Sequence, residues 1–328
     1  MLAYIARRLV LAASVVLVTL VATFMLFYAG PADPAQSLCG ELRCNPAKLV
    51  EIRKSLHLDR PIAVQFSEYF TGLFTGREIL DGGTTQQCSA PCLGYSFRSH
   101  KEVKTEVFTR FPTTAMLAIM SMVVFLSVGI TTGVYAARRR GTKIDRSVVG
   151  FSQVFGSIPY YIIALLAALY LTVLYPILPR TASFTDGVAP WIVGMLAPAL
   201  ILGLVYSTSY VRYTRAQMVD TLAQDYVRTA KSKGISSVRV TYTHALRGAL
   251  SPVLTILGLD MAGLLSGTLV TEQIFGLDGM GRLSITSLFL DDLPIIMGSV
   301  LMSAVIVVLM NLLVDILYSV IDPRVRLA

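Results

Sequence analysis

The sequence has few charged residues for its length. Asp, Glu, Lys and Arg make up 15% of the 328 residues, whereas hydrophobic residues make up 54%. Soluble domains carry about 25% charged residues, so this composition excludes an ordinary soluble domain. The net charge of +8 does not indicate nucleic acid, because the basic residues are distributed as in a membrane protein.

The sequence also lacks the short motifs of common catalytic sites. It has no G-x-x-x-x-G-K-[ST] phosphate loop, since the Gly-Thr-Lys at 141–143 lacks the upstream glycine. Neither H-E-x-x-H nor G-x-S-x-G occurs, and His57, His100 and His244 lie far apart in the sequence. We therefore predict no catalytic residue, no metal site and no ATP hydrolysis by this chain.

Long apolar runs recur along the chain. A bilayer core about 30 Å thick needs roughly 20 apolar residues in a helix, and in lipid only helices or closed barrels satisfy the backbone hydrogen bonds. Six runs have this length, and they predict six membrane-spanning helices. The runs are 9–32, 111–137, 147–179, 187–211, 248–271 and 293–314, the last continuing to 321. The first run is longer than the apolar part of a signal peptide, so we expect it to be retained.

The basic residues predict the orientation of these helices. If both termini lie inside, sixteen Lys and Arg residues fall on the inner side, against Arg180 and Arg282 in the short outer loops. The long loop at 33–110 is not counted, because loops of this length cross the membrane largely regardless of charge. The inner residues are Arg7, Arg8, Arg138, Arg139, Arg140, Lys143, Arg146, Arg212, Arg215, Arg228, Lys231, Lys233, Arg239, Arg247, Arg324 and Arg326.

All four cysteines lie in the long outer loop. Cys39, Cys44, Cys88 and Cys92 form an even set confined to one compartment, which predicts two disulfides with three possible connectivities. A four-cysteine zinc site is the alternative. The loop is long enough for a small cap with helices near 46–55 and 62–74, and a cap of this size needs disulfides to be stable.

The inner loop at 212–247 is too long for a simple turn. Ala223, Val227 and Ala230 recur at helical spacing, and Gly234 is a helix stop because glycine tolerates the left-handed geometry after a helix end. The pattern predicts a short helix, a turn and a second helix that leads into Pro252. The short helix could lie on lipid headgroups, but its small apolar residues fit a protein groove better.

The sequence here resembles a known family, the ATP-binding-cassette importer permeases of the dipeptide/oligopeptide branch (DppB/OppB type). The likeness begins in the inner loop, at 226–230 with Lys233 and Gly234, which resemble an EAA-type coupling loop in the form used by this branch. Further matches extend over most of the chain. They are Tyr4-Ile5, Arg7-Arg8-Leu9, Leu58-Asp59 and Pro61, His244-Ala245-Leu246-Arg247 with Pro252, Glu272, Phe275, Gly279, Gly281, Arg282 and Leu283 of an E-x-x-F-x-x-x-G-x-G-R-L segment, Asn311-Leu312-Leu313-Val314-Asp315, and Asp322-Pro323-Arg324.

The resemblance implies a type I importer permease in a bacterial inner membrane, multi-pass, with both termini in the cytoplasm. It implies a second homologous permease subunit, two cytoplasmic ATP-binding subunits that bind ATP and Mg, and an extracytoplasmic substrate-binding protein. This chain would bind no cofactor and no nucleic acid. The ATPase-coupling residues implied are Asp225, Tyr226, Val227, Arg228, Thr229, Ala230, Lys231, Lys233 and Gly234. Arg212 and Arg215 are expected to anchor the chain at the membrane edge.

The sequence departs from the family pattern in two places. The generic EAA loop has Glu and Ala where Arg228 and Thr229 stand, although the peptide branch shares this difference. Residues 77–92 form an insertion relative to simpler members, and we expect the cap to face the substrate-binding protein.

One acidic residue lies near the middle of a predicted span. Asp260 is therefore a functional candidate, which would either line the translocation path or bond a neighbouring helix. The small-residue pairs Gly129-x-x-x-Gly133 and Gly263-x-x-x-Gly267 predict close helix packing.

Together these features predict an all-α polytopic membrane protein with six transmembrane helices and a small disulfide-stapled outer cap. The expected divisions are 1–32, with the first span; 33–110, the cap; and 111–328, the permease core with the coupling loop at 212–247. The predicted function is a permease subunit for di- or oligopeptides. Nickel, glutathione or haem is the alternative cargo, and a stand-alone secondary transporter or channel is the alternative mechanism.

Overall fold

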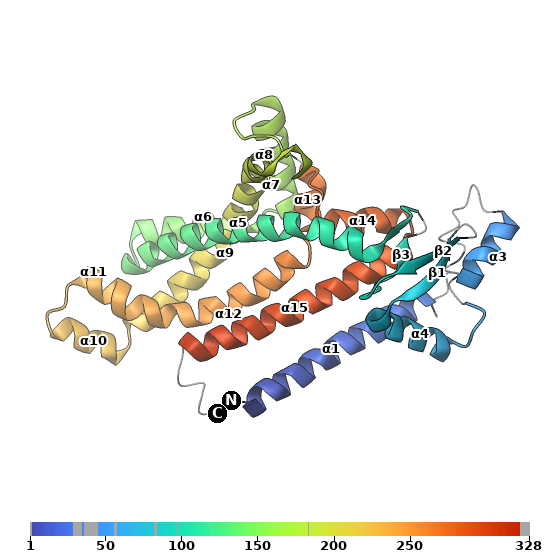
Figure 1. The fold of residues 1–328 in the computed structure, drawn as a ribbon. Helices are drawn as coiled ribbons and strands as arrows, with labels where there is room; N and C mark the ends of the chain where they lie inside the picture. Colours follow the sequence, from blue (N-terminus) through green and yellow to red (C-terminus); the bar gives the residue numbers. More distant parts are fainter. Residues whose placement is uncertain are drawn as a thin grey trace. The chain divides into compact units, whose positions relative to one another are not determined.

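The computed structural model describes residues 2–28, 35, 45–55, 58–81, 84–96, 98–182 and 184–321. The chain divides into two compact units, whose boundaries fall within two long helices and just before residue 278 (Figure 1). Unit 1 comprises Met1–Thr114 and Asp278–Val308, and unit 2 comprises Ala115–Leu277 and Leu309–Ala328.

Unit 1 contains the first helix and the cap. Its elements are α1 (Leu2–Tyr28), α3 (Pro46–Ser55), α4 (Ile62–Thr75), β1 (Arg77–Asp81), β2 (Thr84–Cys88), β3 (Tyr95–Ser96), β4 (Lys101–Glu102), the first part of α5 (Val103–Arg138), α14 (Met280–Phe289) and the first part of α15 (Leu293–Ile321). The helices α3 and α4 confirm the two predicted in the cap.

Unit 2 contains most of the membrane helices. Its elements are the remainder of α5 and α15, with α6 (Lys143–Ser157), α7 (Tyr160–Ala167), the π-helical η1 (Ala168–Leu174), the 3₁₀ turn η2 (Phe184–Asp186), α8 (Val188–Gly194), α9 (Leu196–Leu222), α10 (Asp225–Ser232), α11 (Ser237–Arg239), the π-helical η3 (Val240–Ala245), α12 (Leu246–Leu265) and α13 (Leu269–Phe275).

Most of the predicted spans are continuous helices. Among the described residues, five helical segments are long and apolar enough to cross a membrane. They are Arg7–Tyr28, Val103–Arg138, Val188–Leu222, Ser237–Leu265 and Leu293–Val314. The remaining expected span, at 147–179, is a bent pair of helices, so the predicted number is reached when this pair is counted as one span.

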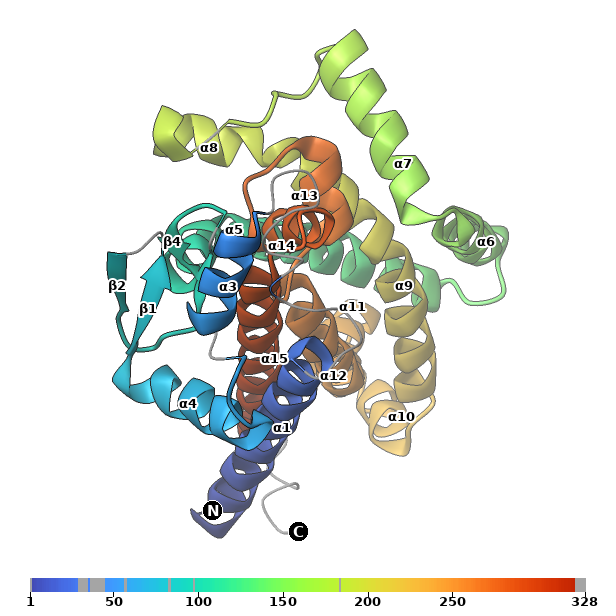
Figure 2. The same ribbon diagram turned by 90° about the vertical axis from the view of Figure 1, so that its right-hand side faces the viewer.

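The third predicted span is not one helix. The segments Lys143–Ser157 and Tyr160–Leu174 meet at an angle of 88°, and Figure 2 shows α6 nearly end-on with α7 turned away from it. Pro159 explains the break, because proline disfavours helical geometry in the residue before it, and Ile158 is extended with ψ 129°. The sequence pattern did not reveal this break, because Pro159 interrupts the helical backbone but not the run of apolar residues.

Two other predicted boundaries differ from the structure. The fourth span was expected to end at Val211, but α9 continues to Leu222 and carries Arg212 and Arg215 within the helix. The fifth span was expected to reach Thr271, but α12 ends at Leu265 and a separate helix, α13, follows. Apolar runs therefore located the helices but not their ends.

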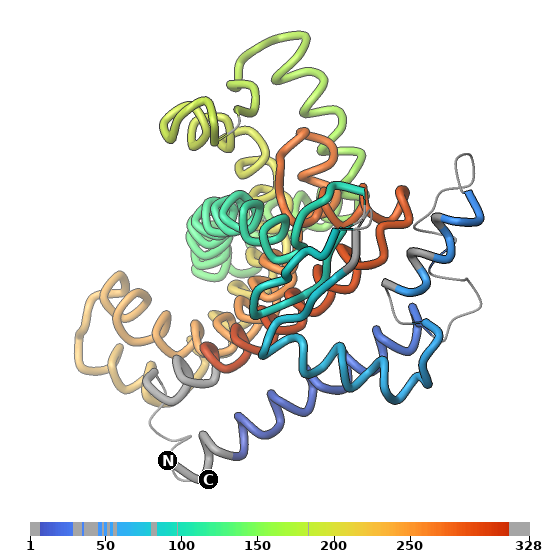
Figure 3. The backbone as a smooth tube through the Cα atoms, turned by 45° about the vertical axis from the view of Figure 1, so that its right-hand side comes forward, coloured from blue at the N-terminus to red at the C-terminus, as the bar shows by residue number. Residues whose placement is uncertain are grey.

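The cap contains β-structure that the all-α prediction lacked. The strands β1 and β2 form an antiparallel hairpin with Arg77 opposite Cys88, and β3 pairs with β4. Figure 3 follows the chain from α4 directly into this hairpin. Ile79, Cys88, Cys92 and Tyr95 form its small core. Apart from these short hairpins, the regular secondary structure of the described chain is helical, as predicted.

Glycines bring α5 and α9 into close contact. A Cβ atom on Gly129 would lie 2.4 Å from Cβ of Tyr210, and one on Gly133 would lie 2.7 Å from Cβ of Thr214. The first small-residue pair therefore packs as predicted. The second pair makes no such contact among the described residues, because a Cβ on Gly263 would meet nothing within 4 Å and Gly267 lies in the break after α12 with φ +131°.

Candidate functional site

The predicted inner-loop helix is present as α10. It begins after the extended Gln224 and ends before Gly234, whose φ is +77°. The Gly234 amide donates to the carbonyl of Lys231 at 3.0 Å, which closes the helix. The short helix, the glycine stop and the second helix leading to Pro252 are all confirmed. Figure 1 shows α10 beyond the carboxyl end of α9 and close to α11.

One face of α10 is buried against its own chain. Val227 is 0% exposed and Ala230 is 8% exposed, and both belong to a single apolar cluster. The other members come from α5, α9, η3 and α12, and they are Val134, Ala137, Met218, Val240, Ala245 and Ala249. This face therefore lies in a protein groove, as its small apolar residues indicated, but the groove is formed by this chain itself. Ala223 is not part of the face, because it is exposed and lies at the end of α9.

The opposite face of α10 is exposed and largely basic. Tyr226 is 50% exposed, and the side chains of Arg228 and Asp225 are 71% and 98% exposed. Thr229, Lys231, Lys233 and Gly234 are also exposed. Arg228 lies 3.8 Å from Asp225, which is a weak contact that leaves the guanidinium available. Of the nine predicted coupling residues, Val227 and Ala230 hold the helix in place and the other seven are exposed on the surface.

Two arginines near the end of α9 join it to α6. Arg215 donates to both carboxylate oxygens of Asp145, at 2.6 and 2.7 Å, and Gly141 donates its amide to the same carboxylate. Arg212 donates to the carbonyl of Ser152 at 2.9 Å. The structure gives these arginines protein partners, whereas the sequence suggested membrane anchors. Bidentate pairing of this kind fixes geometry as well as contributing energy.

Asp260 bonds a neighbouring helix. Its carboxylate accepts a hydrogen bond of 2.8 Å from the hydroxyl of Tyr210, which lies on α9 and is fully buried. The Tyr210 ring lies 4.6 Å from that of Phe125 on α5. The second of the two roles considered for Asp260 is thus observed, and sequence gave no sign that Tyr210 was its partner.

The E-x-x-F segment begins as a short helix with one buried face. In α13, Glu272 is 0% exposed and accepts a hydrogen bond of 3.0 Å from Thr268. The neighbouring Thr271 is hydrogen-bonded to Tyr160 of α7 at 2.7 Å. The helix ends at Gly276 in left-handed geometry, with φ +66°.

The cap is cross-linked and attached to the helices of unit 1. Cys88 and Cys92 form a disulfide, which confirms part of the cysteine prediction and excludes these two residues as zinc ligands. Cys39 and Cys44 lie outside the described residues. The hydroxyl of Ser96 donates to Asp292 at 2.5 Å, and Arg110 pairs with Asp278 at 2.9 Å.

These features define a multi-pass helical membrane protein. At one end of its helix bundle, α10 packs its apolar face against the chain and exposes its basic face. Comparison with known families agrees with this class. Residues 129–327 match the model described as binding-protein-dependent transport system inner membrane component, and residues 1–118 match the model of the N-terminal part of such components. The chain belongs to this family, so it is a multi-pass inner-membrane component of a transport system.

Individual relatives cover nearly the whole chain. A putative peptide transport system permease protein of Brucella abortus is 36% identical, with 99% of both chains aligned. The dipeptide transport system permease protein DppB of Escherichia coli is 32% identical, and the di/tripeptide transport system permease protein DppB of Pseudomonas aeruginosa is 34% identical, again over 99% of both chains. These matches confirm the resemblance to the dipeptide/oligopeptide branch.

Proposed function

We propose that this chain is a transmembrane permease subunit of an ATP-driven importer of di- or oligopeptides. It pairs with a second homologous permease, and two cytoplasmic subunits bind ATP and Mg and hydrolyse the nucleotide. A substrate-binding protein delivers the cargo from outside. The peptide cargo is inferred from the relatives, which are peptide, dipeptide and di/tripeptide permeases and cover 99% of the chain.

The main observation that supports the coupling role is the way α10 packs against the rest of unit 2. A surface that transmits movement between subunits must be stiff, since a flexible loop would absorb the displacement. Val227 and Ala230 fix one side of α10 in an apolar cluster, while Tyr226, Arg228 and Lys231 project from the other side. An ATPase subunit that contacts the exposed face would therefore move α9 and α12 together with α10.

The length of α9 supports placing the coupling helix and η2 on opposite sides of the membrane. With 27 residues at 1.5 Å each, α9 is about 40 Å long, which exceeds the hydrocarbon core of about 30 Å. The turn η2 and α8 precede it and α10 follows it. Together with the basic residues at 212–247, this supports a cytoplasmic α10 and cytoplasmic termini.

The cap supports a role in contact with the substrate-binding protein. The hairpin residues 84–87 are exposed, while Cys88 and Cys92 are buried at its base. The hairpin and its disulfide thus form a rigid projection, which we propose reaches towards the cleft of the binding protein and helps to release the substrate. Deletion of residues 77–93 should then impair docking of the binding protein, and unchanged uptake and docking would contradict this role.

The coupling role is tested by reversing charge on the exposed face of α10. Arg228→Glu combined with Lys231→Glu should lower peptide uptake by at least tenfold and reduce co-purification of the ATPase subunits. The matched control is Lys143→Glu, an exposed basic residue at the start of α6, which should change uptake less than twofold. If the double variant keeps full uptake and its ATPase partners, α10 is not the coupling helix.

A further inference from the structure

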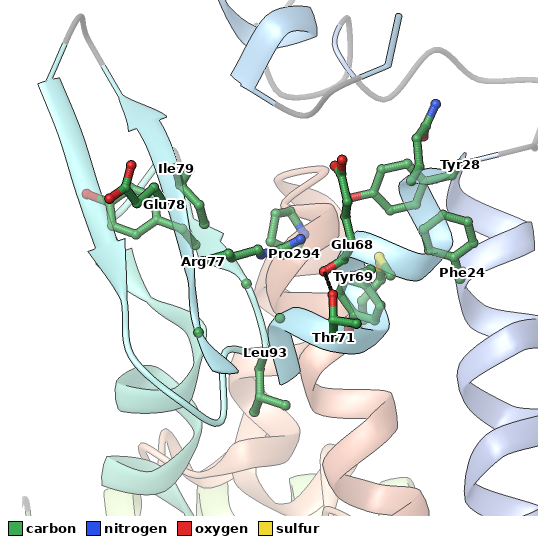
Figure 4. A pocket seen from close by; sticks show the side chains of 16 residues that line it. Phe24, Tyr28, Glu68, Tyr69, Thr71, Arg77, Glu78, Ile79, Leu93 and Pro294 are labelled. Carbon is green, nitrogen blue, oxygen red and sulfur yellow. Dashed lines mark hydrogen bonds between the residues drawn. The ribbon is translucent and has the colours of Figure 1, made fainter. Parts of the chain in front are cut away.

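Unit 1 contains a cavity of about 340 Å³ that the coupling role does not use. Figure 4 shows its walls, which come from the end of α1, from α4, from the start of β1, from residues 93–95 and from the first turns of α15. The volume is at the lower end of the roughly 300–1,000 Å³ range of small-molecule sites. The cavity is therefore large enough for an amino acid or a dipeptide.

Among the described residues that line this cavity, Arg77 is the one basic side chain. The guanidinium carbon of Arg77 lies 5.2 Å from the ring centre of Tyr69, and its Nε atom is buried without a hydrogen-bond partner. Among the described residues, Arg77 has no carboxylate partner in an ion pair. The carboxylate of Glu68 pairs with Arg60, and Figure 4 shows the Glu78 side chain directed away from Arg77.

Arg77 is half-buried, and cations withdrawn from water are normally paired, because removing a charge from water is costly. Arg77 thus has an unused donor group beside a cavity, and guanidinium groups bind carboxylates through two parallel hydrogen bonds. An anion that enters this cavity would gain this pairing without breaking an ion pair in the described chain.

The other walls supply an aromatic surface and a hydrogen-bond acceptor. The rings of Tyr28 and Tyr69 lie 4.5 and 5.9 Å from that of Phe24. Burial raises the pKa of Tyr69 to about 12, so its hydroxyl stays protonated. The amide of Gln65 is oriented by its hydrogen bond to the carbonyl of Arg60, and its Oε1 is buried without a partner. Gln65 can therefore accept a hydrogen bond from an N–H group.

We propose that this cavity binds a small molecule with a carboxylate, an N–H group and an apolar side chain, of the size of an amino acid or a dipeptide. The carboxylate pairs with Arg77, the N–H group donates to Gln65, and the side chain packs against Phe24 and Tyr69. The assignment rests on the residues of the cavity alone and does not depend on the coupling role of α10.

The test uses the full chain in phosphatidylcholine nanodiscs, without ATPase subunits or binding protein, and the dipeptide Ala-Phe as the probe. We expect saturable binding by calorimetry and slower hydrogen exchange in residues 65–79. The C-terminal amide of Ala-Phe and the variant Arg77→Gln should each weaken binding at least tenfold. Arg98→Gln removes the same charge at an exposed residue outside the cavity and should bind normally.

Three outcomes would overturn the proposal. The first is equal binding by the wild type and Arg77→Gln, which would place the dipeptide elsewhere. The second is protection of residues 65–79 by phosphatidylglycerol but not by Ala-Phe, which would indicate a lipid site. The third is no protection of the wild type by Ala-Phe, and this measurement decides the question even if Arg77→Gln does not fold. Because peptide uptake is not measured, failure here is distinct from failure of the transport role.

Discussion

At the scale of single residues, polar side chains form pairs between helices, and the amino-acid composition does not predict these pairs. Asp145 joins α6, the preceding turn and Arg215, with a side chain that is 4% exposed. Asp260 joins α12 to Tyr210 on α9. In both cases the partner is 50 or more residues away, so local sequence patterns cannot identify it.

Loss of Asp145 should destabilise unit 2. In Asp145→Ala, Arg215 keeps a partly buried charge without its partner, and removing one member of a buried pair costs about 3–5 kcal/mol. Because Arg215 is 27% exposed, solvent screening should reduce the cost to about 2–3 kcal/mol. Unfolding of the detergent-solubilised chain measures this change, and Asp225→Ala, with a 98% exposed side chain, is the control. Equal stability of the two variants would contradict a structural role for the pair.

Asp292 should make the stability of unit 1 depend on pH. Burial raises the pKa of its carboxyl above the ordinary 3.8, although the hydrogen bonds from Ser96 and from the Ile295 amide and the charge of Arg98 oppose this, while Glu106 adds to the increase. A raised folded-state pKa means that the folded protein binds the proton more tightly. Stability should therefore fall as pH rises from about 4 through the raised pKa.

Asp292→Asn should remove this part of the pH dependence, because an amide does not titrate. Denaturant unfolding at several pH values would show it as a smaller difference between acidic and neutral conditions than in the wild type. Parallel curves for the two proteins would show that Asp292 does not contribute to the pH dependence.

At the scale of elements, α10 depends on its neighbours to be a helix. Eight residues are too few for a stable isolated helix, so its stability comes from the packing of Val227 and Ala230 against α5, α9, η3 and α12. The sequence predicted the helix and its end at Gly234. It did not predict that this chain would itself bury the apolar face, because the same apolar residues would suit the groove of a partner.

Burying a charge at Val227 should detach α10. Val227→Asp places a carboxylate in an apolar cluster where nothing pairs with it, whereas Thr229→Asp places the same group on the exposed face. We expect trypsin to cut at Lys231 and Lys233 at least tenfold faster in Val227→Asp, and at the normal rate in Thr229→Asp. If both variants are cut at the wild-type rate, packing against this cluster does not hold α10 in place.

At the scale of the whole molecule, the two units differ in their secondary structure and in their cross-links. Unit 2 is helical, whereas unit 1 contains a cap with short hairpins and a disulfide. Small cap structures bury little apolar surface and rely on cross-links. The disulfide should therefore matter for the cap and much less for the helices of unit 2.

Replacing the disulfide tests this division. Cys88→Ser combined with Cys92→Ser should destabilise the cap by about 2 kcal/mol, the value that loop-closure entropy gives for so short a loop. Limited proteolysis should show faster cleavage at 77–93, while hydrogen exchange in α9 and α12 stays unchanged. Gln86→Ala, at an exposed residue of β2, is the control. Normal proteolysis of the double variant would show that the hairpin holds the cap without the cystine.

The sequence by itself determined the properties that depend on local composition. Apolar runs located the membrane helices, the distribution of Lys and Arg indicated an orientation, and Gly234 marked the end of α10. The tertiary structure decided which atoms meet. Only it revealed the break at Pro159 as an 88° bend, the burial of Val227, and the partners of Arg215 and Asp260. The reason is physical: hydropathy and backbone preference act over a few residues, whereas contacts between helices join residues that are distant in the chain.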